Sequence, residues 1–405
     1  MLRSIGRILP IDLSIDFHKM VGHVICAMAV LHTAAHVVNH VAHTNESLTS
    51  WLGGTVVGIT GVVALLVSTT MWFCSQDSLR RKGAFEMFFY THLLFVVWFI
   101  IMLLHAPDFW KWVVLPGLLF LVEILLRNRK CTHHVSVQAL HALPSGVTRV
   151  RLDRPAHFKF RAGDYLFVQI PVIARHEWHP FTITSAPHET EALEIHVRSL
   201  GNWTSKLYRI ATEEADHSAQ APITASLDGP FGTPSSEIFT RQNVVLIGAG
   251  IGVTPFAAIL KSIFAQRRMY GADAMPVKKI HFLWLNRAHE SFEWFSKMLI
   301  QLEDEDTDGI LNINIFITGI KMDARSSTLD IALDLFRTQT KRDLITGLHA
   351  PTRFGRPDWT EFFQEVADAH QSEPVDVFFC GPPRLSADLH RQAQAHGFSF
   401  RREIF

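Results

Sequence analysis

The chain has 405 residues, which is enough for two or three domains. Its formal net charge is zero, so there is no electrostatic case for nucleic-acid binding. Hydrophobic residues make up 48% of the sequence and charged residues 19%, with the apolar residues concentrated in the first third.

Four apolar segments in that first third are long enough to cross a lipid bilayer. Residues 51–73 contain no charged side chain, and a helix of this length extends about 34 Å. The other three segments are residues 20–39, 87–106 and 109–126. We therefore expect an integral membrane bundle of four helices.

Basic residues predict the orientation of this bundle. The loop at 40–50 contains no Lys or Arg, and the other loop on that side contains only Lys111. The basic residues gather at the opposite ends of the segments: Arg3, Arg7, Arg80, Arg81, Lys82, Arg127, Arg129 and Lys130. Because basic loops remain cytoplasmic, both termini and the whole second half are expected in the cytoplasm.

Histidines of the first and third segments are candidate haem ligands. An ionisable residue inside a membrane needs a partner, and two imidazoles from facing helices can hold one haem iron. His18 and His32 are separated by about 21 Å of helix rise, and His92 and His105 by about 20 Å. These matching heights predict two haem groups, one above the other.

Spacing alone leaves the pairing open. On an ideal helix, His105 lies roughly 140° around the axis from His92. Both histidines can bind haems only if a turn between them is overwound or if the two haems are approached from different sides. His23 and His36 have the same separation as His92 and His105. Trp98 is either an electron relay between the haems or a packed aromatic. We favour ordinary polar contacts between helices for His23, His40 and His43.

The second half has the pattern of two soluble domains. Short β-type runs separated by Gly, Pro and Asp turns predict an antiparallel barrel, with strands at 134–140, 165–171 and 192–199. From about residue 242 strands alternate with helices, which predicts a parallel sheet covered by helices. The four cysteines have neither metal-site nor disulfide spacing. We expect domains at 1–130, 131–235 and 236–405.

A flavin site is predicted within the barrel. "HPFTITS" at 179–185 follows a strand, and "RSLGNWTSKL" at 198–207 follows later. Thr182 offers a hydroxyl for the flavin, and Arg198 a cation for its pyrophosphate. The turn at 201–204 offers backbone N–H groups where a helix begins. The alternative is a plain strand end and helix cap.

A pyridine-nucleotide site is predicted in the strand–helix region. "VVLIGAGIGVTPFAAIL" at 244–260 is a strand, a glycine-rich turn and a helix, with Pro255 in the first helical turn. Gly248, Gly250 and Gly252 allow the backbone to approach a pyrophosphate at the helix N-terminus. Three further candidates for the nucleotide site are Arg287, which could pair with a 2′-phosphate, Arg356, and Cys380 at the end of a strand. Phe405, the last residue, could stack on the flavin.

Taken in order, these motifs resemble the NADPH oxidase family, most closely its calcium-regulated, EF-hand-bearing branch. The resemblance covers essentially the whole chain and includes "FHKMVG", "FYTHLLFVVWF", "HPFTITSAP", "GNWTSKL", "IGAGIGVTPF", "TGLHAPTRFGRPDW" and "FFCGPP". It implies a transmembrane haem bundle followed by a ferredoxin-reductase-like module, an FAD-binding β-barrel plus an α/β NADPH-binding domain. Electrons would pass from NADPH through FAD and two b-type haems to oxygen, producing superoxide.

The resemblance also implies roles for individual residues. The inner haem would be held by His18 and His92 and the outer haem by His32 and His105, with His36 lining the oxygen site and Trp98 as relay. The flavin contacts would be His179, Pro180, Phe181, Thr182, Arg198, Gly201, Trp203, Thr204 and Phe405. The NADPH contacts would be Gly248, Gly250, Gly252, Thr254, Pro255, Arg287, Arg356, Cys380 and Gly381.

Two departures keep other functions open. Family members have six transmembrane helices, whereas this chain begins in what looks like the loop after the second, as a truncated chain or a minimal enzyme would. The sequence also contains no EF-hand loop. Alternatives are a ferric-chelate reductase with the same electron path, an inactive nucleotide-binding fragment, and a flavoprotein reductase anchored by inert helices. The lipid bilayer and a small-molecule acceptor are the expected partners.

Overall fold

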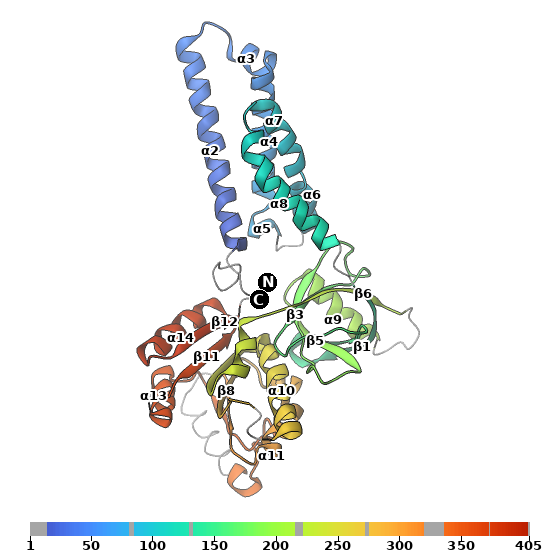
Figure 1. Ribbon diagram of the computed structural model, residues 1–405, viewed down its shortest axis with the longest axis vertical. Coiled ribbons are helices and arrows are strands. Elements are labelled where there is room, and N and C mark those ends of the chain that lie inside the picture. The colour runs from blue at the N-terminus through green and yellow to red at the C-terminus, as the bar shows by residue number, and fades with distance from the viewer. Residues whose placement is uncertain are drawn as a thin grey trace. The chain divides into compact units, whose positions relative to one another are not determined.

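The computed structural model divides the chain into two compact units, Met1–Cys131 and Thr132–Phe405. Figure 1 labels many of the helices and strands of both units. The structure describes residues 14–80, 85–128, 133–214, 222–271, 275–319, 336–371 and 373–403. The described residues of the first unit form helices, and those of the second form two six-stranded sheets with covering helices.

Three stretches of the first unit are long and apolar enough to cross a membrane. They are α2 (Ser14–His43), α4 (Val56–Cys74), and the pair α6 (Phe85–His92) and α7 (Phe95–His105), which together span Phe85–His105. The fourth expected span also forms a helix, α8 (Trp110–Asn128), with Pro116 inside it. Among the described residues, α8 does not count as a membrane-spanning helix by length and composition, because it contains three charged residues, Lys111, Glu123 and Arg127. Three of the four expected spans thus contain helices long and apolar enough to cross a membrane.

The segment expected as one helix at 51–73 is broken into two. A short helix, α3 (Leu48–Gly54), ends before Thr55, whose backbone is extended, with φ −111° and ψ 146°. The Thr55 hydroxyl then accepts a hydrogen bond of 2.9 Å from the Gly58 amide and caps α4. A side chain at position 58 would lie 2.5 Å from the Trp51 carbonyl oxygen, so the turn requires glycine there. The cap and this close approach correct the single-helix prediction.

The third span is overwound where α6 meets α7. The Leu94 amide donates to the Thr91 carbonyl at 3.2 Å, and the Val96 amide donates to the Leu93 carbonyl at 3.2 Å. Both bonds join residues three apart, as in a 3₁₀ turn, which winds more tightly than an α-helix. This is the kind of turn that a common facing of His92 and His105 requires.

The first sheet of the second unit is a closed antiparallel barrel, as predicted. Its strand order is β4-β3-β6-β1-β2-β5. An antiparallel bridge between Ile183 and Ile195 joins the two ends of that order. The strands are β1 (His133–Leu143), β2 (Val147–Asp153), β3 (Tyr165–Gln169), β4 (His179–Thr182), β5 (Ala192–Arg198) and β6 (Thr224–Phe231). Helix α9 (Asn202–Glu214) follows β5 and packs on β1 and β2.

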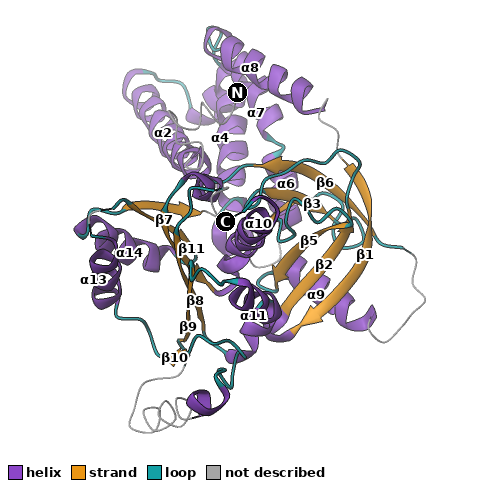
Figure 2. Cartoon of the chain, turned by 60° about the horizontal axis from the view of Figure 1, so that its bottom comes forward, coloured by secondary structure: helices purple, strands orange, loops and turns teal. Residues whose placement is uncertain are grey.

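The second sheet is wholly parallel, with strand order β10-β9-β8-β7-β11-β12. Its strands are β7 (Asn243–Ala249), β8 (Lys279–Asn286), β9 (Leu311–Ile317), β10 (Thr352–Phe354), β11 (Val375–Cys380) and β12 (Ser399–Glu403). One face packs on α10 (Thr254–Tyr270) and α11 (Ser296–Glu305), and the other on α13 (Trp359–His370) and α14 (Pro383–Ala395) (Figure 2). The predicted α/β architecture is confirmed, although β9, β10 and β12 were not among the expected strands.

Several sequence predictions lie outside the described residues. These include most of the basic residues that predict membrane orientation: Arg3, Arg7, Arg81, Lys82, Arg129 and Lys130. The cytoplasmic placement of the second unit and the boundary at 235/236 therefore stay predictions.

Candidate functional site

Two histidine pairs face each other across the helices of the first unit. The ring centroids of His18 on α2 and His92 at the end of α6 lie 6.0 Å apart, with the ring planes at 75°. Those of His32 on α2 and His105 at the end of α7 lie 6.3 Å apart, also at 75°. These are the two pairs that the resemblance implies. The 3₁₀ turn between α6 and α7 contributes to this facing, because it rotates His105 further around the span relative to His92.

The spacing of each pair fits one metal ion between two imidazoles. Metal–nitrogen bonds of about 2 Å on both sides place the two ring centroids roughly 6 Å apart. Among the described residues, no group of three or more His, Cys, Asp or Glu side chains is placed to hold a metal by itself. A porphyrin supplies four equatorial nitrogens, so two axial histidines are sufficient for haem. The donor set therefore fits haem.

A cavity of about 550 Å³ adjoins the second pair. It is within the size range of cofactor pockets and is lined mainly by apolar side chains. Four of the predicted residues line it: His32, His36, Trp98 and His105. The His36 ring lies 4.4 Å from the His32 ring, one helical turn away. Both histidines of the second pair, the predicted relay and the predicted oxygen-site residue thus share one cavity.

The remaining histidines of α2 have other partners. The ring N–H of His23 donates to the Lys19 carbonyl at 2.7 Å, and that of His43 donates to the Asn39 carbonyl at 3.0 Å. The His40 ring stacks on Trp51 at 4.5 Å. The hydrogen bonds of His23 and His43 thus lie within α2 and do not join helices as we expected. The contacts of His23 and His40 with other helices are ring contacts, to Trp72 and Trp51. His23 does not pair with His36.

The predicted flavin residues gather at one edge of the barrel. On β4, the His179 ring lies 4.6 Å from the Trp203 ring, and the Phe181 ring 5.7 Å from it. Trp203 is buried, and its indole N–H has no hydrogen-bond partner in the described part of the chain. Pro180 of this group is exposed, whereas Thr182 is buried. An aromatic edge with an unpaired donor fits a ring system with polar atoms.

The turn before α9 is organised by Thr204. Its hydroxyl accepts from the amides of Leu200 and Gly201, both at 2.9 Å. Both amides are therefore already hydrogen-bonded within the turn. Gly201 itself is exposed, and a Cβ at this position would have no atom within 4 Å.

The glycine turn lies where β7 and β11 end side by side. Gly248 pairs in register with Cys380, and a Cβ on Gly252 would collide with the Cys380 carbonyl oxygen. Gly250 has φ +62°, a conformation that favours glycine. The indole N–H of Trp284 on β8 donates to the Gly250 carbonyl at 3.1 Å and holds the turn. Only glycines allow this backbone packing.

Other residues connect the flavin edge with this turn. A Cβ on Gly250 would lie 3.1 Å from Nη1 of Arg198, so the flavin-side guanidinium reaches the glycine turn. Thr254 and Pro255 begin α10, and the Thr254 hydroxyl donates to the Ile251 carbonyl at 3.0 Å. The predicted anion-binding groups of the two domains thus lie together in the second unit.

Cys380 and Gly381, at the end of β11, lie beside this turn. Cys380 is 5% exposed, and burial raises the pKa of its thiol. The thiol therefore stays protonated and neutral, which excludes a thiolate nucleophile. A Cβ on Gly381 would lie 2.7 Å from the Ala249 side chain, so this strand end also requires glycine.

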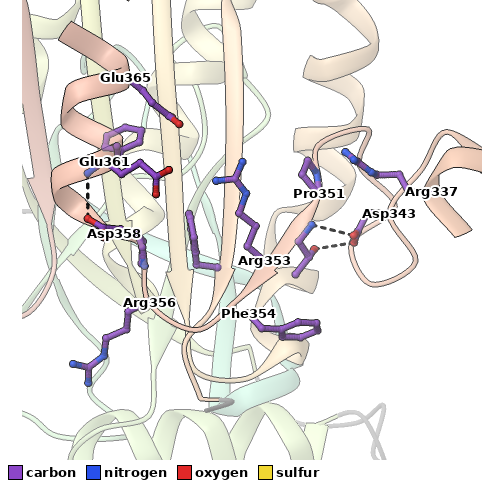
Figure 3. A pocket seen from close by; sticks show the side chains of 13 residues that line it. Arg337, Asp343, Pro351, Arg353, Phe354, Arg356, Asp358, Glu361 and Glu365 are labelled. Carbon is purple, nitrogen blue, oxygen red and sulfur yellow. Dashed lines mark hydrogen bonds between the residues drawn. The ribbon is translucent and has the colours of Figure 1, made fainter. Parts of the chain in front are cut away.

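Two further predicted arginines, Arg287 and Arg356, are exposed. Arg287 is exposed directly after β8. Arg356 is exposed and lines a second cavity of about 550 Å³, beside the start of α13. Figure 3 shows this cavity, with Arg356 directed away from Glu361 and Glu365. None of the other predicted nucleotide residues lines it, and Phe405 lies outside the described residues.

Sequence reasoning missed two polar residues. Asn286 ends β8, is buried, and its amide nitrogen has no hydrogen-bond partner within the described ranges. It lies near the glycine turn, because a Cβ on Gly250 would be 3.9 Å from its Oδ1. A polar residue closing an apolar parallel strand was a usable signal. Thr60 on α4 lies 3.0 Å from Nδ1 of His105, and no sequence pattern indicates that contact.

Three family models match the chain in succession. A ferric reductase-like transmembrane component matches residues 4–103. An FAD-binding domain matches residues 132–235, and a ferric reductase NAD-binding domain matches residues 241–394. The matches agree with a membrane part followed by flavin- and nucleotide-binding parts.

Named relatives cover nearly the whole chain. It is 38% identical to a superoxide-generating NADPH oxidase heavy chain of Dictyostelium discoideum, over 96% of this chain and 79% of that protein. It is 36% identical to human NADPH oxidase 5, over 99% of this chain and 61% of that protein. Rat dual oxidase 1 is 32% identical over 96% of this chain and 27% of that protein. The chain thus spans about three fifths of NADPH oxidase 5 and a smaller part of the dual oxidase. By these matches, the chain belongs to the NADPH oxidase family.

Proposed function

We propose that this protein moves electrons from NADPH across a membrane to oxygen and produces superoxide. The balanced reaction oxidises one NADPH to NADP⁺ and a proton and reduces two oxygen molecules to two superoxide ions. The observation that carries the proposal is the pair of facing histidines, repeated at 6.0 and 6.3 Å between ring centroids. Two such pairs on the same helices suit a relay through a membrane rather than a single buried cofactor.

In the second unit, the residues would bind and orient the nucleotide and the flavin. When bound, FAD accepts a hydride and gives up electrons singly, which joins a two-electron donor to one-electron carriers. The glycine turn and the N-terminus of α10 would receive a pyrophosphate, with Arg198 supplying a charge beside Gly250. His179–Thr182 would form the flavin edge. Cys380, neutral and packed at the end of β11, would border the nicotinamide.

In the first unit, the four paired histidines would hold two b-type haems. When bound, haem carries single electrons, and its potential depends on its axial ligands and their surroundings. Trp98 lines the cavity of the second pair and would serve as a relay toward it. His36, adjacent to His32 in the same cavity, would face the oxygen site.

Orientation and nucleotide choice are part of the proposal. Basic loops predict that the second unit is cytoplasmic, so NADPH would be taken from the cytosol and oxygen reduced on the opposite side. Arg287, exposed directly after β8, would pair with a 2′-phosphate and favour NADPH over NADH.

The second candidate is a ferric-chelate reductase with the same electron path. It is favoured by the match of the membrane part to a ferric reductase-like component. The two candidates differ in the final acceptor alone, so the acceptor must be measured.

Haem content and acceptor choice test the proposal on the purified chain in detergent. About two low-spin b-type haems per chain are expected, together with NADPH-driven acceptor reduction that superoxide dismutase quenches. Dismutase-insensitive reduction of a ferric chelate would instead support the second candidate. A haem-free chain that still binds NADPH would contradict both candidates and leave a nucleotide-binding fragment or an anchored flavoprotein.

A further inference from the structure

The histidine of the second pair on α7, His105, is hydrogen-bonded by a neighbouring helix. Its Nδ1 lies 3.0 Å from the hydroxyl oxygen of Thr60 on α4. The same helix also passes close to the ring, because a Cβ on Gly61 would lie 3.0 Å from Cε1 of His105. Thr60 and Gly61 therefore hold one edge of the imidazole.

The hydroxyl of Thr60 determines which nitrogen of His105 carries the proton. Its single proton is donated to the Val56 carbonyl at 2.7 Å, one turn earlier on α4. The oxygen can then only accept from His105, so the hydrogen must be on Nδ1. A neutral imidazole protonated at Nδ1 has its free electron pair on Nε2, which is the nitrogen available to a metal.

The first pair lacks this arrangement. Nδ1 of His92 is buried and has no hydrogen-bond partner within the part of the chain that the structure describes. The two pairs match in the distance between ring centroids and in the angle between ring planes. They differ at Nδ1, which has a hydrogen-bond partner in His105 but not in His92 among the described residues. A hydrogen bond to that nitrogen raises the basicity of the ligand and favours the oxidised metal.

We propose that Thr60 is a positioning residue for the outer haem, which fixes the tautomer and ring orientation of His105 and lowers the reduction potential of that haem. This inference rests on the proposed function, since it assumes that His32 and His105 hold a haem. With the Thr60 hydroxyl in place, the outer haem would be a stronger reductant toward the acceptor than it would be without that hydroxyl.

The test is a potentiometric titration of the full chain in detergent, followed by haem absorbance, for Thr60→Val and Thr60→Ser. Valine keeps the shape of threonine and removes the acceptor, whereas serine keeps the hydroxyl. The matched control is Thr70→Val, because Thr70 also lies on α4, donates to the Leu66 carbonyl at 2.8 Å and does not line the cavity. The outer haem is identified as the redox component that is absent when His32→Ala is titrated in the same way.

In Thr60→Val we expect the midpoint potential of the outer haem alone to rise, with the inner haem unchanged. Thr60→Ser and Thr70→Val should titrate like the wild type. Low-temperature electron paramagnetic resonance of the oxidised protein should show altered g values for one haem in Thr60→Val only.

Two results would overturn the inference. One is a Thr60→Val protein that keeps two haems and titrates like the wild type. The other is a loss of haem in both Thr60→Val and Thr60→Ser, because serine keeps the hydroxyl and the hydrogen bond would then not account for the loss. Loss of one haem in Thr60→Val, restored in Thr60→Ser, supports it. A wild-type chain without haem would contradict the proposed function instead.

Discussion

The two units of this protein use burial in opposite ways. In the second unit, large side chains such as Trp284 and Phe282 are completely inaccessible, and both sheets contribute to cores of buried apolar residues. In the first unit, the three apolar spans are 0 to 11% buried over their most hydrophobic windows. Lipid tails are as apolar as leucine, so these helices gain little by covering apolar surface. Polar contacts therefore mark the interior of the first unit better than burial does.

Histidine makes the difference concrete. His196 in the second unit is buried, hydrogen-bonded to the Thr184 hydroxyl at 2.9 Å and packed 4.6 Å from Phe295. Burial lowers its pKa to about 3, so it is a neutral core residue. The paired histidines of the first unit face one another instead, with the spacing of a shared metal. A histidine is a ligand candidate here because of its partner rather than its burial.

The sharpest way to separate the two units is to remove one histidine pair. His18→Ala combined with His92→Ala should reduce transfer to the final acceptor to background, because one haem is lost. Reduction of a soluble dye by NADPH should persist, since the flavin and nucleotide residues are untouched. Both rates can be measured on one preparation, with His43→Ala as the control, because His43 contacts only its own helix in the described contacts.

Persisting acceptor reduction in the double variant would show that the helices are an inert anchor. Loss of dye reduction together with acceptor reduction would show that the two units cannot be separated in this way.

A glycine substitution should have unequal effects in the two units. Gly252→Ala puts a methyl group into the Cys380 carbonyl and should destabilise the second unit by about 3 kcal/mol or weaken NADPH binding correspondingly. Gly53→Ala has no atom within 4 Å and should change little. Flavin release on heating and KM for NADPH measure both effects. Equal behaviour of the two variants would contradict the packing that we describe around the glycine turn.

His196 should make the second unit sensitive to acid. Its pKa is about 3 when folded and 6.5 when unfolded, so the unfolded chain binds the proton first. The stability it contributes is complete above pH 6.5 and is lost as the pH falls toward 3. At pH 5 the loss is about 2 kcal/mol.

The measurement is the melting temperature of the second unit at pH 7 and pH 5, followed by flavin fluorescence. His196→Asn should show a smaller difference between the two pH values than the wild type. His281, whose pKa burial lowers to about 4, remains in both proteins and contributes equally. An unchanged difference would mean that His196 is more accessible to protons than its burial implies.

The smallest effect concerns the contact between the barrel and the parallel sheet. The indole N–H of Trp294 donates to the Pro144 carbonyl at 2.9 Å. Trp294→Phe should cost about 1 kcal/mol, the typical value of one such bond. Trp112→Phe, at a position 80% exposed on α8, should cost nothing measurable. The same flavin-release melt compares them, and equal melting temperatures would contradict a stabilising role for the bond.

Much of the second unit could be predicted because its signals are local. Alternating apolar residues, turn residues and a glycine-rich strand–helix junction each lie within a few neighbouring positions. The missed strands β9, β10 and β12 have weaker patterns, and β10 covers only Thr352–Phe354. Strand order depends on contacts between distant residues, which no local pattern contains.

The paired histidines were recognisable for a different reason. Their heights follow from helix rise, which the sequence determines directly. Their facing did not follow, because an ideal helix separates His92 and His105 by roughly 140°. The overwound turn at Leu93–Leu94, whose hydrogen bonds reach back only three residues, makes up part of this angle, at roughly 20° per residue.

The sequence by itself determined the order of the parts, the membrane-length helices, the glycine turn and the histidines at two heights. Composition and periodicity are properties of the chain alone, so they could be read without coordinates. Only the tertiary structure decided that Arg198 reaches Gly250, that the Asn286 side chain lies beside that turn, and that Thr60 holds His105. Each of these contacts joins residues that are far apart in the chain, and packing alone brings them together.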